Sequence, residues 1–219
     1  MQEPQTNTQQ KVSIGSLGSG KDFILQKNYN SAALPSYSKP IKVSVFIKPF
    51  TKQTYKSFLK ASASQSEHVS INYTDSIKVK PQYIQFKIAD KVELIEALNA
   101  KENLRVKTYL GHNSSTNIVT SISMAFNRAN LDVIKQASGV FLIEYLSKQY
   151  ALQLYKDGVK SEIIQFKEGV VFAYNTSNCC WQEDTRHRTN IVDIVDKYNR
   201  CPNKTFRSAN KAKTENKLF

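Results

Sequence analysis

The sequence predicts a mainly β protein of the α+β class, with an antiparallel, β-sandwich-like body and two or three short peripheral helices. Many segments alternate apolar and polar residues with a period of two, which is the pattern of antiparallel strands that keep one face in water. The pair Asp157-Gly158 lies between two such segments and favours a two-residue hairpin turn. The few stretches with helical spacing are short and lie between the strand-like segments.

The predicted strands of the first half lie between residues 41 and 127. Residues 41–50 are an example, because Val43, Val45 and Ile47 form one side and the intervening residues form the other. The same alternation predicts strands over 41–50, 68–74, 82–90, 103–110 and 117–127.

The second half continues with strands predicted over 140–146, 150–156, 159–167 and 170–175. Asp157-Gly158 predicts a type I′ turn, and Glu168-Gly169 predicts the next turn. Together they indicate a meander of three or four strands. Two small β-rich lobes that meet near residue 128 are an alternative to one sandwich.

Helical spacing predicts helices at 91–100 and 189–199, with shorter or weaker ones at 52–62 and 130–138. Asp90 precedes the first, and Glu93 follows three residues later, which is an acidic form of the capping box. The residues of this helix expected to face the core are Val92, Ile95 and Leu98. In 189–199 the residues at helical spacing are Ile191, Ile194, Val195 and Tyr198.

The two ends of the chain differ in composition from its middle. Residues 1–40 hold three of the seven glycines and lack a sustained apolar period, which predicts a flexible tether. Residues 203–219 are basic and polar, and they predict a frayed tail with docking points at Phe206, Leu218 and Phe219. The β-rich globular body is therefore expected to span 41–202.

The formal net charge of +13 makes an anionic surface or an acidic partner a natural counterpart. Of the 31 basic residues, 25 are Lys and only six are Arg. Since Arg is the usual side chain for bidentate recognition of phosphates and base edges, this composition favours a solvated lysine surface over a nucleic-acid interface. No stretch approaches the roughly 18 apolar residues of a membrane span.

The three cysteines, Cys179, Cys180 and Cys201, allow several interpretations. The favoured one is a disulfide from Cys180, or from Cys179, to Cys201, with one thiol left over. Buried free thiols are the second. A zinc site that adds His187 is the third, although zinc motifs usually separate paired cysteines by about two to four residues. A Cys nucleophile with His187 as its base has no flanking signature.

Residues 14–22, IGSLGSGKD, match a P-loop up to the last position, where Asp22 stands in place of Ser or Thr. A P-loop needs a buried parallel strand before it and a long helix after it, because the helix N-terminus helps to hold the phosphates. Here the preceding segment is short and polar, and Pro35 follows soon after Lys21. We expect neither a nucleotide nor another cofactor, and no catalytic residue is assigned.

The remaining features favour a binding or structural role. The polar start, the Gly- and Ser-containing segment, the β-rich body and the late disulfide are together typical of a mature envelope protein whose signal or anchor has been removed. We expect an extracytoplasmic, non-enzymatic accessory subunit, periplasmic, outer-membrane associated or secreted, whose partners are proteins of a larger envelope or surface assembly. The alternatives are a basic nucleic-acid-binding module and a hydrolase with an unrecognised site.

Overall fold

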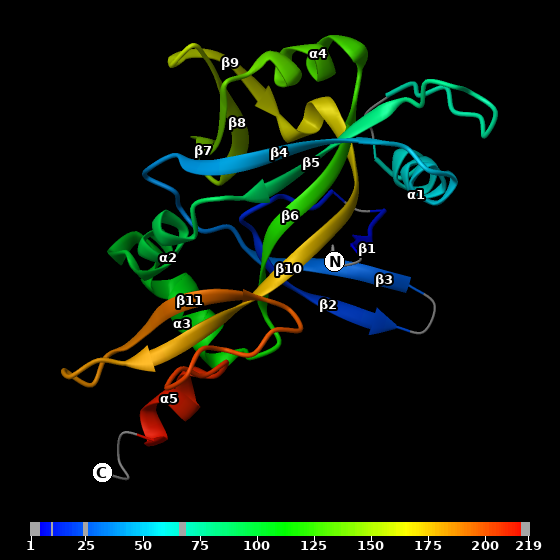
Figure 1. The fold of residues 1–219 in the computed structure, drawn as a ribbon. Helices are drawn as coiled ribbons and strands as arrows, with labels where there is room; N and C mark the ends of the chain where they lie inside the picture. The colour runs from blue at the N-terminus through cyan, green and yellow to red at the C-terminus, as the bar shows by residue number, and fades with distance from the viewer. Residues whose placement is uncertain (1–4, 10, 24–25, 66–68, 216–219) are drawn as a thin grey trace.

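The computed structural model describes residues 5–9, 11–23, 26–65 and 69–215, and it contains one 11-stranded antiparallel sheet (Figure 1). The strands are β1 (Thr6–Asn7), β2 (Leu17–Phe23), β3 (Gln26–Ala33), β4 (Ile41–Pro49), β5 (Gln82–Ile88), β6 (Asn117–Phe126), β7 (Gly139–Leu146), β8 (Gln149–Lys156), β9 (Val159–Gln165), β10 (Gly169–Glu183) and β11 (Thr189–Asp196).

The main path through the sheet is β1-β10-β6-β5-β4-β7-β8-β9. The long strand β10 pairs with β6 and β1, and its C-terminal part pairs with β11. The β2–β3 hairpin joins the sheet where β2 pairs with β6. Strands from before and after residue 128 therefore belong to one continuous sheet.

Short helices lie around this sheet, as Figure 1 shows. They are α1 (Lys52–Ser62), α2 (Lys91–Asn99), α3 (Leu104–His112), α4 (Arg128–Gln136) and α5 (Ala209–Glu215), with single 3₁₀ turns at Lys101–Asn103 and Phe166–Glu168. The predicted fold class, mainly antiparallel β with short peripheral helices, is confirmed. In the part of the chain that the structure describes, none of the helices has the length and apolarity needed to cross a membrane.

Two clusters of buried side chains hold the fold together. The larger one packs one face of the sheet against α2, α3 and the segment before β2. The smaller one is aromatic and lies beneath α1, where the Phe50 ring is 5.0 Å from Tyr83 and 5.7 Å from both Phe58 and Phe172. Tilted and edge-on rings at such separations are the favoured geometry for aromatic pairs.

Most of the predicted elements form where the sequence placed them. Helix α1 starts at a reciprocal cap between Thr51 and Thr54. The side chain of Asp90 accepts a hydrogen bond from the Glu93 backbone N–H at the start of α2. The helix then buries Leu94 and Leu98, whereas Val92 is 67% exposed, so the predicted inward face was wrong at Val92.

The predicted hairpin turn at Asp157-Gly158 is confirmed. Both residues have positive φ, 51° and 81°, and Lys156 pairs with Val159 across the turn. A type I′ turn requires positive φ at both central residues, and its twist matches that of the flanking strands. The meander contains β7, β8 and β9, after which β10 leaves to pair with β6.

The helix predicted over 189–199 is wrong, because this segment forms strand β11. Ile191 and Ile194 are both buried, and their separation by three residues imitated a helical face. In the structure Trp181 pairs with Ile191 and Cys180 pairs with Asp193, so Val192 is an extra residue in a β-bulge. The bulge shifts the phase of the strand and places both isoleucines on the same side.

Two predicted strands are also wrong. Residues 103–110 belong mostly to helix α3, in which Leu110 is buried while Leu104 is 63% exposed. Val106 and Leu110 are four residues apart, which places them on one helical face. Residues 69–74 have no strand partner, and Val69 instead packs into the aromatic cluster under α1. Residue 68 lies outside the described residues.

The predictions for the two ends of the chain need the largest correction. Val12, Ile14 and Leu17 are almost fully buried in the main core, and Leu17–Phe23 and Gln26–Ala33 form the paired strands β2 and β3, so the described part of 1–40 is not a flexible tether. At the other end, Phe206 pairs with Trp181 and α5 buries Ala209 and Ala212. The remaining docking points, Leu218 and Phe219, lie outside the described residues.

Candidate functional site

The cysteine region lies at the end of β10. Cys180 and Cys201 form a disulfide, with Cα atoms 5.7 Å apart, which is one of the two predicted pairings. Cys179 points to the other face of the strand and is a buried free thiol, and burial raises its pKa to about 12. At neutral pH Cys179 is therefore protonated, which removes the nucleophilic and metal-binding form of the side chain.

The structure does not bring the candidate zinc ligands together. Cys180 and Cys201 are joined by the disulfide, and His187 lies in the exposed turn between β10 and β11. Its Nδ1 atom lies 3.7 Å from Glu183 Oε1, within ion-pair distance. Within the described residues there is no group of three or more side chains suited to a metal ion.

The P-loop-like stretch forms a turn and a strand. The backbone N–H of Gly15 donates to the Val119 carbonyl, and Gly15 has a φ of 81°, which suits a residue without a side chain. Residues from Leu17 onwards are strand β2, which pairs with β3. The chain thus returns in an antiparallel hairpin, so the stretch lacks the strand–loop–helix geometry that holds phosphates.

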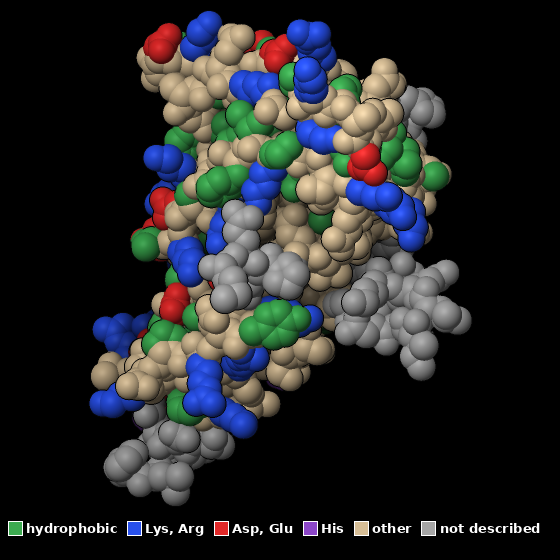
Figure 2. Space-filling model, turned by 45° about the vertical axis from the view of Figure 1, so that its right-hand side comes forward, with side chains coloured by type: hydrophobic (Ala, Val, Ile, Leu, Met, Phe, Trp, Pro, Cys, Tyr) green, Lys and Arg blue, Asp and Glu red, His purple; other side chains and the backbone are tan. Residues whose placement is uncertain are grey.

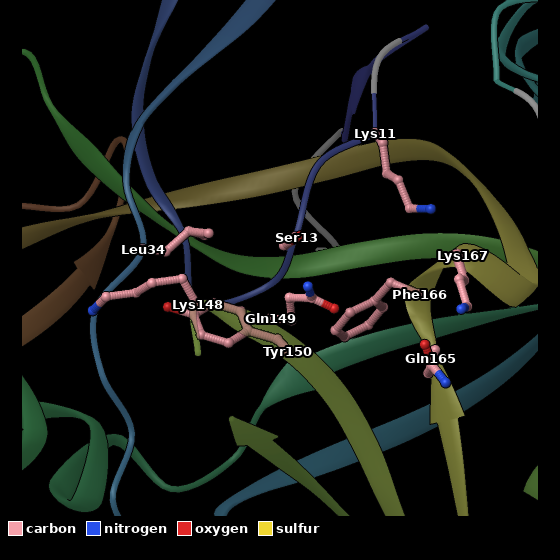
Figure 3. Close-up of a pocket in the computed structure, with 9 residues that line it drawn as sticks. All are labelled: Lys11, Ser13, Leu34, Lys148, Gln149, Tyr150, Gln165, Phe166 and Lys167. Carbon is pink, nitrogen blue, oxygen red and sulfur yellow. The ribbon is translucent and has the colours of Figure 1, made fainter. Parts of the chain in front are cut away.

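A small hollow lies where the segment before β2 meets β8 and the turn after β9 (Figure 3). Its volume is about 210 Å³. Figure 3 shows that the amines of Lys11, Lys148 and Lys167 extend in different directions, and Lys148 Nζ donates to Ser36 Oγ outside the hollow, at 2.7 Å. Because the three amines do not converge, the hollow is a weak candidate for binding one anion.

A larger hollow of about 540 Å³ lies between α3, α5 and the ends of β10 and β11, and we call it the α3–α5 groove. One wall comes from α3, the floor from the ends of β10 and β11, and the other wall from α5. It is lined by Asn99, Leu104, Lys107, Thr108, Gly111, His112, Trp181, His187, Arg188, Thr189, Asn190, Ala209, Asn210 and Lys213. The lining contains three Lys or Arg side chains and no carboxylate.

The disulfide and Gly111 place the two helical walls. Cys201 ties the segment that leads to α5 to strand β10, and Phe206 then pairs with Trp181. A Cβ atom at Gly111 would lie 3.2 Å from the Ala209 Cβ and 3.8 Å from the Trp181 ring. The absence of a side chain at Gly111 therefore allows α3 and α5 to approach closely.

Hydrogen bonds hold two of the basic side chains of the groove, Lys107 and Arg188. Lys107 Nζ donates to Asn190 Oδ1 at 2.6 Å, and Arg188 Nε donates to Asp184 Oδ2 at 3.0 Å. Burial lowers the pKa of Lys107, and the positive charge of Arg188 acts in the same direction. The backbone N–H groups of Arg188 and Arg186 that donate to Asp184 hold the pKa of its carboxyl below the usual value.

Sequence reasoning singled out His187 in this region but missed the groove itself. The sequence predicted a strand at Lys107 and a helix at Thr189, so these two residues were not expected to line the same groove. The charged run from Glu183 to Arg188 is the only local signal in the sequence for a polar site.

Comparison with family models, with curated proteins and with solved structures gave no match.

Proposed function

We propose that the protein is a non-enzymatic, extracytoplasmic accessory subunit that binds other proteins of a larger cell-envelope or surface assembly. The observation that carries this proposal is the Cys180–Cys201 disulfide. Disulfides persist in oxidising compartments and are rare in reducing ones. This bond joins two segments of the main body, so its formation is coupled to the folded arrangement of β10 and α5.

Two surface features support a role in assembly. In the described part of the chain β9 lies at the end of the sheet path and pairs only with β8, and its residues 159–163 are exposed. Such an edge suits the addition of a strand from a partner. Figure 2 shows Lys and Arg side chains spread over one face with few acidic ones, which suits a partner or surface of negative charge.

The proposal is tested by fractionating cells of the native source, cross-linking the intact envelope and identifying the captured proteins by mass spectrometry. We expect the protein in the envelope fraction, with the disulfide formed, cross-linked to the same envelope proteins in repeated preparations. A cytosolic location with three free thiols would overturn the compartment. Retention on RNA or DNA at physiological ionic strength would favour a nucleic-acid-binding module instead.

A further inference from the structure

Lys107 is a partly buried cation on the α3 wall of the α3–α5 groove. Its Nζ donates to Asn190 Oδ1, which is a neutral acceptor, and among the described residues no carboxylate forms an ion pair with it. Burial and the charge of Arg188 lower the pKa of Lys107, and the charge of Asp184 opposes them without reversing the shift. Since buried charges are usually paired, an anion in the groove would supply the partner that this amine lacks.

Arg188 is held near Lys107 by the same hydrogen-bond network. Asn190, which accepts from Lys107, donates to Asp184 Oδ2 at 3.4 Å, and Arg188 Nε donates to the same oxygen at 3.0 Å. The Arg188 side chain is 65% exposed, and in the described part of the chain its guanidinium uses only Nε for hydrogen bonds within the protein. Both cations are therefore positioned before a ligand arrives, which lowers the entropic cost of binding.

Lys213 adds a third cation from the opposite wall, so that α3, the β10–β11 hairpin and α5 each contribute one. Figure 1 shows these three elements together at one end of the molecule. Lys213 is exposed, and no ion pair forms at its amine within the described residues. The two acidic side chains of the hairpin, Glu183 and Asp184, do not line the groove. A ligand in the groove therefore meets cationic donors without a competing carboxylate.

We propose that the α3–α5 groove binds a small organic phosphate through the phosphate group of a monoester. Such a group has three acceptor oxygens, which matches one cation from each of three elements. Lys binds phosphate as a point charge, whereas a carboxylate is best recognised by the complete fork of Arg, and Asp184 already occupies Nε of Arg188.

The size of the groove favours an organic phosphate over the bare ion. Its volume of about 540 Å³ is in the range of small-ligand sites, and a phosphate ion alone would fill only a small part of it. Leu104, which is 63% exposed, gives the lining an apolar surface for the organic part. This site goes beyond the proposed function, because its ligand is not a protein partner.

The test is a calorimetric titration of the full chain, with its disulfide intact, at physiological ionic strength. The probes are glycerol 3-phosphate and glucose 6-phosphate, with glycerol, glucose and glucuronate for comparison. We expect saturable binding of one phosphate per chain, about tenfold weaker binding of glucuronate, and none of the neutral compounds. Lys107→Gln and Lys213→Gln are each expected to weaken binding by about tenfold. Lys160→Gln, at an exposed lysine on β9, is the matched control and should leave the affinity unchanged.

Several outcomes would overturn the site. They are no saturable binding of either phosphate, equal binding of glucuronate, and the same loss of affinity in Lys160→Gln, which would indicate attraction to the overall positive charge. Binding only to vesicles that contain phosphatidic acid, whose headgroup is also a phosphate monoester, would replace the small ligand with a lipid surface. Because Lys213 is exposed, Lys213→Gln keeps the test possible if Lys107→Gln does not fold. The compartment and partner are tested on native cells, so the two proposals fail independently.

Discussion

At the scale of single residues, amide side chains bond to backbone N–H and C=O groups that no neighbouring strand reaches. Asn99 donates to the Ile191 carbonyl at 2.7 Å and accepts from the Ile191 N–H at 3.1 Å, on the outer edge of β11. Gln65 does the same for Val171 in β10, and Asn103 for Ser36. Each amide offers one donor and one acceptor, as a neighbouring strand would.

Replacing Asn99 with Ala is expected to lower the free energy of unfolding by about 2 kcal/mol, because both backbone groups of Ile191 lose their partner. Urea denaturation followed by circular dichroism measures the loss. Glu96→Gln is the matched control on the same helix, since its ion pair with Lys39 is largely exposed and contributes little. A loss as small as that of the control would show that the Asn99 pairing does not stabilise β11.

The thiol of Cys179 is the second residue with a measurable consequence. Its pKa is raised to about 12, well above the roughly 8.5 of an unfolded cysteine. The folded state therefore holds its proton more tightly, and this contribution to stability is lost as pH rises from about 8.5 towards 12. We expect no reaction of the native protein with a thiol reagent at pH 8, and one reactive thiol per chain in denaturant.

Cys179→Ala separates this effect from the titration of the many lysines. The variant is expected to show a smaller decrease in unfolding free energy between pH 8 and pH 10 than the natural chain, by up to about 2 kcal/mol. Identical slopes in the two proteins, or a thiol that reacts without denaturant, would contradict the burial of Cys179.

At the scale of elements, the same apolar spacing led to different structures. A bulge at Val192 made a strand look helical, and the exposed Leu104 made a helix look like a strand. Local signals that depend on backbone conformation were more reliable. The turn at Asp157-Gly158 and the cap at Asp90 both depend on short-range hydrogen bonds or on φ, so neighbouring elements do not change them.

Gly158→Val is expected to destabilise the β8–β9 hairpin by about 1–3 kcal/mol, because a β-branched residue resists a φ of 81°. No atom lies within 4 Å of an added Cβ, so the cost is that of the backbone and not of a clash. Gly158→Asn is the control, since Asn tolerates this conformation. Thermal unfolding compares the two, and equal stabilities would contradict the turn type.

At the scale of the whole molecule, the first residues of the described chain are part of the fold. Ile14 and Leu17 are fully buried against strands that come much later in the sequence, and Tyr37 Oη donates to the Gly15 carbonyl. Strand β2, which precedes residue 40, belongs to the same sheet as the strands that follow it, so the core does not begin at residue 40. Removal of the N-terminal segment would therefore expose part of the core and not merely shorten a tether.

Ile14→Ala tests this arrangement and is expected to cost about 2–5 kcal/mol, because it leaves a cavity in a packed core. Ser13→Ala, at the partly exposed neighbouring position, is the control and should change stability little. Both are measured by chemical denaturation. A change of less than about 0.5 kcal/mol for Ile14→Ala would restore the interpretation of this segment as a tether.

The sequence alone determined the class of the fold, most of the strands of the β-rich body, the hairpin turn, the cap of α2 and the disulfide partner Cys201. These features depend on the alternation of apolar residues, on backbone conformation or on a small number of cysteines, all of which are visible locally. The tertiary structure decided whether 189–196 is a strand, where the N-terminal segment packs and which side chains share the α3–α5 groove. Periodicity reports which residues avoid water but not which surface covers them, and Lys107, Thr189 and Lys213 line one groove only after distant segments pack together.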